Sequence, residues 1–197
     1  MKKTLLTGAL GFVIAALAAA PAFAGPVEGR KILLKDNGKK EKINALLKGS
    51  GVEGISAAAL EALQGSPGGA MLDVCAGSGV VGSLELPYAN WSTNKKGTLL
   101  KYKDKGNTSG IKVISLKPGK SLKIVGKNTV LEMGAALQSV AVRLTVGDMK
   151  TCANYSDPKK DTGSQFKAKK GAAPSDCEDE TLGCAVGDGS PSAAFLD

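Results

Sequence analysis

The stretch Val140–Val146, VAVRLTV, has the most regular pattern in the chain. Valine or leucine occupies every second position, and Ala141, Arg143 and Thr145 lie between them. Strict alternation with a period of two is typical of a β-strand that has one face in the core. We therefore expect an extended strand here, with its valines and its leucine in the hydrophobic core.

Turn signals outside this strand predict further short strands. Asp36-Asn37-Gly38 separates two apolar runs within Gly29–Gly49, which is typical of a β-hairpin. Pro118-Gly119 lies between two similar arms, ISLK and KSLKI, and this dipeptide favours a type II turn. One helix signal covers Ala57–Leu63, with Ser56 as its N-cap. Together these patterns predict a mainly β fold, an antiparallel sandwich or barrel-like domain with one short helix.

Residues 1–24 show the three-part pattern of a secretory signal peptide. Lys2 and Lys3 precede an apolar run, and the segment ends in the small-x-small site Ala22-Phe23-Ala24. We expect cleavage after Ala24 and a location in the periplasm or outside the cell. The apolar run is shorter than the roughly 20 residues of a membrane span, and no later stretch is apolar enough to be one. Residues 25–184 would then form the β-rich domain, and residues 185–197, rich in Gly, Ser, Pro and Ala, a flexible tail.

The chain contains no histidine, and this excludes several kinds of active site. A Ser-His-Asp triad, a Cys-His nucleophile and a His-ligated zinc ion all require that residue. The glycine-rich segment Cys75–Gly82 fits neither the nucleophile-elbow pattern nor a dinucleotide-binding or phosphate-binding loop. We interpret it as a turn or bulge, and we predict no catalytic residue, no metal site and no cofactor.

Four cysteines lie in the predicted exported part. An even number in an oxidising compartment indicates two disulfides, for which three pairings exist. Metal binding is disfavoured because there is no histidine and no C-x-x-C pair. Clustered carboxylates near the C-terminus have the ligand type that calcium prefers, but their spacing fits no EF-hand loop, so a solvated acidic loop is favoured. These carboxylates belong to Asp176, Glu178, Asp179, Glu180 and Asp188.

Lysines are the main candidates for a binding site in a chain with a formal net charge of +8. Leu99–Lys127 interleaves them with apolar residues, so that alternate lysines share one side of an extended segment. A second basic stretch is Lys159–Lys170. The candidate polyanion-binding residues are Lys101, Lys103, Lys105, Lys117 and Lys120.

A simpler explanation of these lysines is also available. Lysines on strands protect a sheet against aggregation, and a single Trp with three Tyr provides no stacking platform for single-stranded nucleic acid. The sequence by itself therefore favours a solvated sheet face over a dedicated polyanion site.

Two segments, ILLKDNG near residue 32 and LLKYKDKG near residue 99, are similar to each other. The domain could thus consist of two similar halves, about 28–86 and 87–184, although chance similarity between lysine-rich strands explains the match equally well.

Four segments in a fixed order resemble a recurring β-rich domain of exported proteins from environmental bacteria, whose function is not established. They are LPYANWS, GTLLKYKDK, VAVRLTVGDMKTCANY and FKAKKGAAPSDC. The resemblance implies an exported β-rich domain and a bridge between Cys152 and Cys177, and it implies no catalytic residues. Cys75 would then pair with Cys184, and glycines near both would allow the close approach of the two chains.

We therefore expect an exported structural or interaction module without catalytic activity. One alternative is a binding module for anionic envelope polymers or extracellular nucleic acid, acting through surface lysines. Another is a hydrolase or inhibitor whose active loop the sequence does not reveal. Binding that weakens steeply with added salt would separate the first alternative from a purely structural role.

Overall fold

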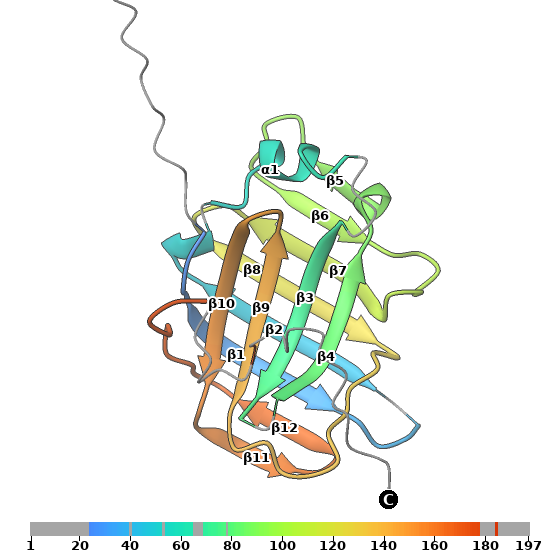
Figure 1. Ribbon diagram of the computed structural model, residues 1–197, viewed down its shortest axis with the longest axis vertical. Helices are drawn as coiled ribbons and strands as arrows, with labels where there is room; N and C mark the ends of the chain where they lie inside the picture. Colours follow the sequence, from blue (N-terminus) through green and yellow to red (C-terminus); the bar gives the residue numbers. More distant parts are fainter. Residues whose placement is uncertain are drawn as a thin grey trace, which may run out of the picture.

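The computed structural model describes residues 24–39, 41–52, 54–64, 69–77, 79–177 and 184. Within them the chain forms two antiparallel β-sheets that stack face to face, and the strands of the small sheet cross those of the large one (Figure 1). The large sheet has the order β11-β12-β1-β2-β8-β7-β6-β5 and the small sheet the order β10-β9-β3-β4. The predicted mainly β sandwich with one short helix is confirmed.

The strands have the following bounds. The large sheet contains β1 (Glu28–Lys35), β2 (Lys42–Lys48), β5 (Trp91–Thr93), β6 (Leu100–Lys103), β7 (Ile111–Lys117), β8 (Ser121–Lys127), β11 (Pro158–Thr162) and β12 (Gln165–Ala168). The small sheet contains β3 (Ala70–Ala76), β4 (Gly79–Leu86), β9 (Val140–Val146) and β10 (Met149–Tyr155). The short helix is α1 (Ala57–Glu61), and single 3-10 turns cover Ser50–Val52 and Tyr88–Asn90.

The hydrophobic core lies between the two sheets. The valines and the leucine of β9 are fully buried there, as their alternation predicts. Ile32 and Leu34 of β1 and Leu72 of β3 are buried in the same core cluster. Complete burial of one such side chain stabilises a fold by about 1.5–3 kcal/mol, so the alternating strands account for the cohesion of the sandwich.

The local signals in the sequence form the predicted turns and cap. Gly38 and Gly119 have φ values of 68° and 67°, the left-handed region that glycine adopts without strain. The Lys120 N–H donates to the Lys117 carbonyl at 3.0 Å, which closes the turn between β7 and β8. Ser56 accepts a hydrogen bond from the Ala59 N–H at 3.2 Å and so caps α1. Gly65-Ser66-Pro67, a sequence that favours the end of a helix, lies outside the described residues.

Tyr155 at the end of β10 connects the small sheet to the large one. Its hydroxyl lies 3.2 Å from the carbonyl oxygens of both Lys31 and Leu46, and burial raises the pKa of the phenol. Gly29 lies directly against the ring, where a Cβ atom would collide with it. A glycine is therefore required at this point of β1, beside the bulge that follows it.

The order of hairpins repeats along the chain. The hairpin β1–β2 lies in the large sheet and β3–β4 in the small one, and β7–β8 and β9–β10 follow the same order. In both sheets the two hairpins are neighbours, through β2 with β8 and through β3 with β9. The segment LLKYKDKG lies in β6 and its loop, whereas β7 is the topological counterpart of β1, so the two repeats do not coincide. Duplication of the halves 28–86 and 87–184 stays a hypothesis.

Among the described residues, no helix reaches the length and hydrophobicity that a bilayer crossing requires.

Candidate anion-binding face

The predicted lysines lie on or beside one face of the large sheet. Lys101 and Lys103 point outward from β6, whereas Leu100 and Tyr102 of the same strand point into the core. Lys117 points outward at the end of β7. The other two are not at ladder positions, because Lys105 follows β6 in a loop and Lys120 follows the Pro118-Gly119 turn.

The strand register adds further lysines to the same face. Residues directly opposite each other in an antiparallel pair project to the same side of the sheet. By this rule eleven lysines share the outward face of the large sheet, and we call this set the lysine face. Its members are Lys31, Lys35, Lys42, Lys48, Lys101, Lys103, Lys117, Lys123, Lys127, Lys160 and Lys167.

The lysine face is nearly free of negative charge. Among the described residues, Glu28 is the one acidic residue at an outward ladder position, and its carboxylate lies 3.7 Å from Arg30. Asp161 of β11 turns the other way and accepts hydrogen bonds from the N–H groups of Leu137 and Gln138. No member of the face forms an ion pair with a carboxylate in the part of the chain that the structure describes.

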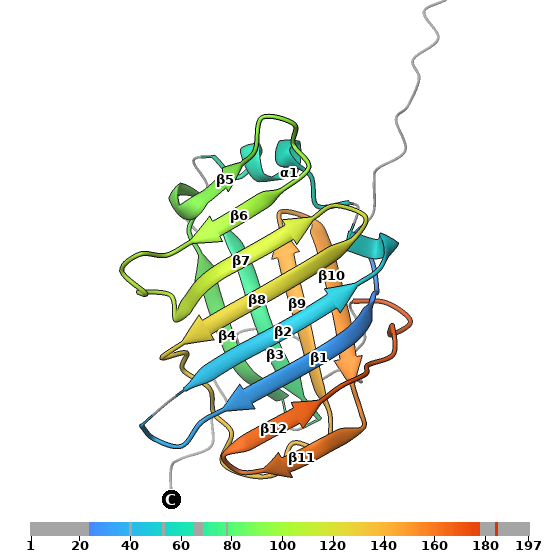
Figure 2. The same ribbon diagram turned by 180° about the vertical axis from the view of Figure 1, so that it is seen from behind.

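The face is also uncovered. Figure 2 shows the eight strands of the large sheet side by side, with no helix or other described segment crossing them. Half-buried apolar side chains lie at its centre, where lysine stems can pack over them while the ammonium groups stay in water. These side chains are Leu33, Leu46, Val113 and Val125. The second basic stretch contributes Lys160 and Lys167, which are directly opposite each other.

Among the hollows of the described surface, two lie near β5, at the margin of the large sheet. An open groove of about 490 Å³ separates the β5–β6 turn from the β7–β8 turn and is lined in part by Lys117 and Lys120. A smaller cleft of about 90 Å³ lies beside α1 and is lined by Tyr88, Trp91 and Glu61. The groove extends the lysine face, whereas the cleft has no lysine in its lining.

A buried loop acid holds the end of β6 in place. Asp104 accepts hydrogen bonds from the Ser109 N–H at 2.8 Å, the Ser109 hydroxyl at 3.0 Å and the Thr108 hydroxyl at 3.1 Å. Burial alone would raise the pKa of this carboxyl, but these hydrogen bonds outweigh it and the pKa is lowered. The loop that follows carries Lys105, so Asp104 orders one margin of the lysine face.

We expect Asp104→Asn to lower the free energy of unfolding by about 1–3 kcal/mol at pH 7, because the charge-assisted hydrogen bonds are lost. A lowered folded-state pKa means that the stabilisation is present above the ordinary carboxyl pKa and is lost as pH falls through the folded value. Urea unfolding at pH 7 and pH 3 should therefore show a gap between the two proteins that narrows in acid. A gap of the same size at both pH values would contradict this role of the charge.

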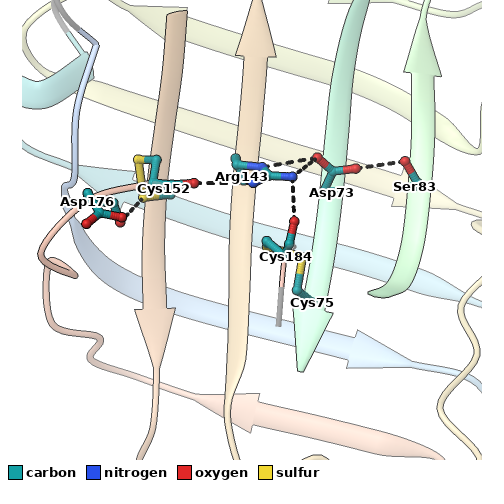
Figure 3. Close-up of a disulfide and its surroundings, with 8 residues drawn as sticks. Asp73, Cys75, Ser83, Arg143, Cys152, Asp176 and Cys184 are labelled. Carbon is teal, nitrogen blue, oxygen red and sulfur yellow. Dashed lines mark hydrogen bonds and ion pairs between the residues drawn. A yellow bond between two sulfur atoms is a disulfide. The ribbon is translucent and has the colours of Figure 1, made fainter. Parts of the chain in front are cut away.

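On the other side of the sandwich, the outward face of the small sheet carries buried polar residues instead of exposed lysines (Figure 3). Arg143 of β9 forms an ion pair with Asp73 of β3 at 3.1 Å, and both side chains are buried. Asp73 also accepts a hydrogen bond from the Ser83 hydroxyl at 2.7 Å. Alternation predicts an outward Arg143 correctly, but the sequence shows no sign that this outward face is covered.

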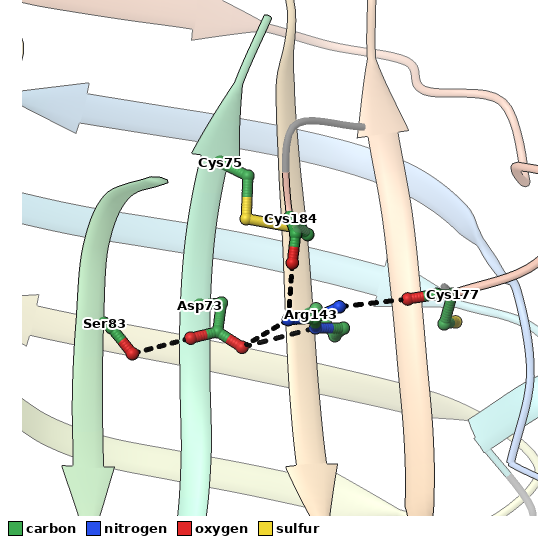
Figure 4. A network of polar contacts seen from close by, with 6 residues as sticks. All are labelled: Asp73, Cys75, Ser83, Arg143, Cys177 and Cys184. Carbon is green, nitrogen blue, oxygen red and sulfur yellow. Dashed lines mark hydrogen bonds and ion pairs between the residues drawn. A yellow bond between two sulfur atoms is a disulfide. The ribbon is translucent and has the colours of Figure 1, made fainter. Parts of the chain in front are cut away.

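Two disulfides hold Cys177 and Cys184 over this outer face of the small sheet (Figure 4). Cys152 is bonded to Cys177, as the resemblance implied, and Cys75 is bonded to Cys184, which confirms the predicted pairing of the other two cysteines. The Arg143 guanidinium donates to the carbonyl oxygens of Cys177 at 3.3 Å and Cys184 at 2.9 Å. The carbonyl groups of Cys177 and Cys184 thus accept hydrogen bonds from the buried guanidinium, and Asp73 supplies its counter-charge. Apart from Asp176, the carboxylates suggested for calcium lie outside the described residues, which contain no metal-binding group of acidic side chains.

No protein-family model, curated protein or solved structure matched this chain. The resemblance to a domain of exported bacterial proteins therefore stays a prediction.

Proposed function

We propose that the protein is an exported, non-catalytic binding module that holds an anionic polymer of the cell envelope against the lysine face. The observation that supports it most strongly is the strand register, which collects lysines from seven strands on one surface. No described segment covers this surface, and the single described carboxylate at its ladder positions is already paired. A surface of one sign of charge raises the local concentration of ligands of the opposite sign and steers their approach.

A solvated sheet face explains the same lysines less well. Protection of a sheet against aggregation needs charges on its edge strands, and β11 and β5 are the edges of this sheet. Most members of the lysine face lie instead on the interior strands β1, β2, β8 and β7. A surface usually mixes both signs of charge, whereas Glu28 is the one acidic residue at the described ladder positions of this face.

Two further parts of the proposal, export and a non-catalytic role, rest on other observations. The N-terminal pattern is that of a secretory signal peptide, and the two disulfides suit an oxidising compartment. A chain without histidine lacks the most common general base. In the small sheet, Asp73 and Arg143 are fully engaged with each other, with Ser83 and with backbone carbonyls.

Binding to a linear polyanion tests the proposal. We expect the protein to bind immobilised polyphosphate at low ionic strength, and the affinity to fall steeply with added salt because the charges are exposed. A triple variant, Lys31→Gln with Lys101→Gln and Lys123→Gln, should lose at least about tenfold in affinity, a change of roughly 1.4 kcal/mol.

The matched control removes the same charge away from the face. Lys95→Gln with Lys96→Gln and Lys170→Gln alters two residues after β5 and one after β12, all exposed. This variant should retain most of the affinity. Equal losses in the two variants, or no binding by the wild-type protein, would favour a structural module with merely solvated lysines.

A further inference from the structure

One part of the lysine face concentrates charge more than the rest. Lys42 of β2 lies directly opposite Lys35 on one neighbouring strand and directly opposite Lys127 on the other. Adjacent strands are about 4.8 Å apart, so three lysines follow one another across the sheet within about 10 Å. We call these three residues the lysine row. On the left of Figure 2 the ends of β1 and β8 meet the start of β2, and this is where the row lies.

Such a row lowers the stability of the protein when no ligand is bound. Like charges directly opposite in an antiparallel pair destabilise it, and Lys42 has such a neighbour on both sides. Elsewhere on the face, Lys160 and Lys167 form a single pair of this kind, and most other lysines lie opposite uncharged residues. Lys123, for example, lies opposite Leu46 and Ser115.

The described surroundings do not neutralise the row. Asp36 follows β1 and accepts a hydrogen bond from the Gly38 N–H within its own turn. Glu41 precedes β2, and neither it nor Asp36 forms an ion pair with the row. On the other side, Gln165 of β12 lies directly opposite Lys35 and adds an uncharged amide.

We infer that the lysine row is a subsite for phosphoryl groups within the proposed polymer-binding face, an inference that rests on the proposed function. A phosphoryl group presents several strong acceptor oxygens around one centre, and lysine binds phosphate as a point charge on a flexible stem. Three stems that start from adjacent strands can bring their ammonium groups to different oxygens of one group. A carboxylate has two oxygens in one plane and a single charge, so it can contact fewer of the three ammonium groups at once.

The subsite is tested with two probes, linear polyphosphate and polyglutamate of matched charge. The variant Lys35→Gln with Lys42→Gln and Lys127→Gln should lose at least tenfold more affinity for polyphosphate than the variant altered at Lys31, Lys101 and Lys123. For polyglutamate the two variants should lose similar amounts, since each removes three charges from the same face.

The outcomes separate the two proposals. Equal losses of polyphosphate affinity in the two variants would overturn the subsite and leave the proposed function standing. A wild-type protein that binds neither polymer would overturn the proposed function, and the subsite with it.

A stability measurement gives a readout that does not depend on either polymer. Lys42→Gln relieves repulsion on both sides and should raise the urea midpoint of unfolding. Lys123→Gln is the matched control, with neutral cross-strand partners, and should leave the midpoint nearly unchanged. A midpoint that does not rise for Lys42→Gln would show that the row is not electrostatically strained, and would count against the subsite.

Discussion

Replacing both Cys75 and Cys184 with alanine should lower the free energy of unfolding by about 4–5 kcal/mol. The bridge joins residues 109 positions apart, and closing so long a loop removes much of the conformational entropy of the unfolded chain. The bond also fixes the Cys184 carbonyl over Arg143, so its loss removes a partner from a buried charge. Alanine is the appropriate replacement because both cysteines are buried in an apolar cluster.

The second bridge provides the comparison. Cys152 and Cys177 are 25 positions apart, and their replacement with alanine should cost about 3 kcal/mol. Urea unfolding of the two double variants under the same conditions gives both values. A larger loss for the shorter loop would show that loop entropy does not set the order.

Asp73→Ala should lower the free energy of unfolding by about 3–5 kcal/mol, because it leaves the buried Arg143 guanidinium without its counter-charge. The two carbonyl oxygens that Arg143 contacts carry only partial charge and cannot replace the carboxylate. The Ser83 hydroxyl also loses its acceptor.

A double-mutant cycle with Arg143→Met distinguishes this mechanism from simple loss of packing. Arg143→Met in the Asp73→Ala background removes the unpaired buried charge, so it should cost much less there than in the wild-type protein. Additive costs, measured by chemical unfolding, would mean that the two side chains act independently.

Much of the fold could be predicted because its signals are local. The alternation in Val140–Val146, the Asp36-Asn37-Gly38 turn and the Ser56 cap each depend on a few neighbouring residues, and each forms as expected. The start of β4 is harder to predict, because the segment Cys75–Gly82, which we interpret as a turn or bulge, also contains the first residues of this strand, which begins at Gly79. Its first residues contain two glycines, which carry no apolar pattern.

The candidate site could be predicted only in part, because it depends on strand register. Lys101, Lys103 and Lys117 were chosen from one continuous stretch, and the structure places them on the lysine face. Lys35 and Lys42 come from a hairpin more than 50 residues earlier, and only the pairing of β2 with β8 brings them beside Lys127. The covered face around Arg143 likewise depends on disulfides between distant residues.

The most direct test of the central claim is the location of the bound polyanion. Backbone amide NMR spectra of the wild-type protein, recorded during titration with short linear polyphosphate, report every strand at once. We predict that shift changes concentrate on β1, β2, β8 and β7 and are largest at Lys35, Lys42 and Lys127, while β3 and β9 stay unchanged. Changes confined to the small sheet or to the cleft beside Trp91, or no changes at saturating polyphosphate and low salt, would contradict a binding role for the lysine face.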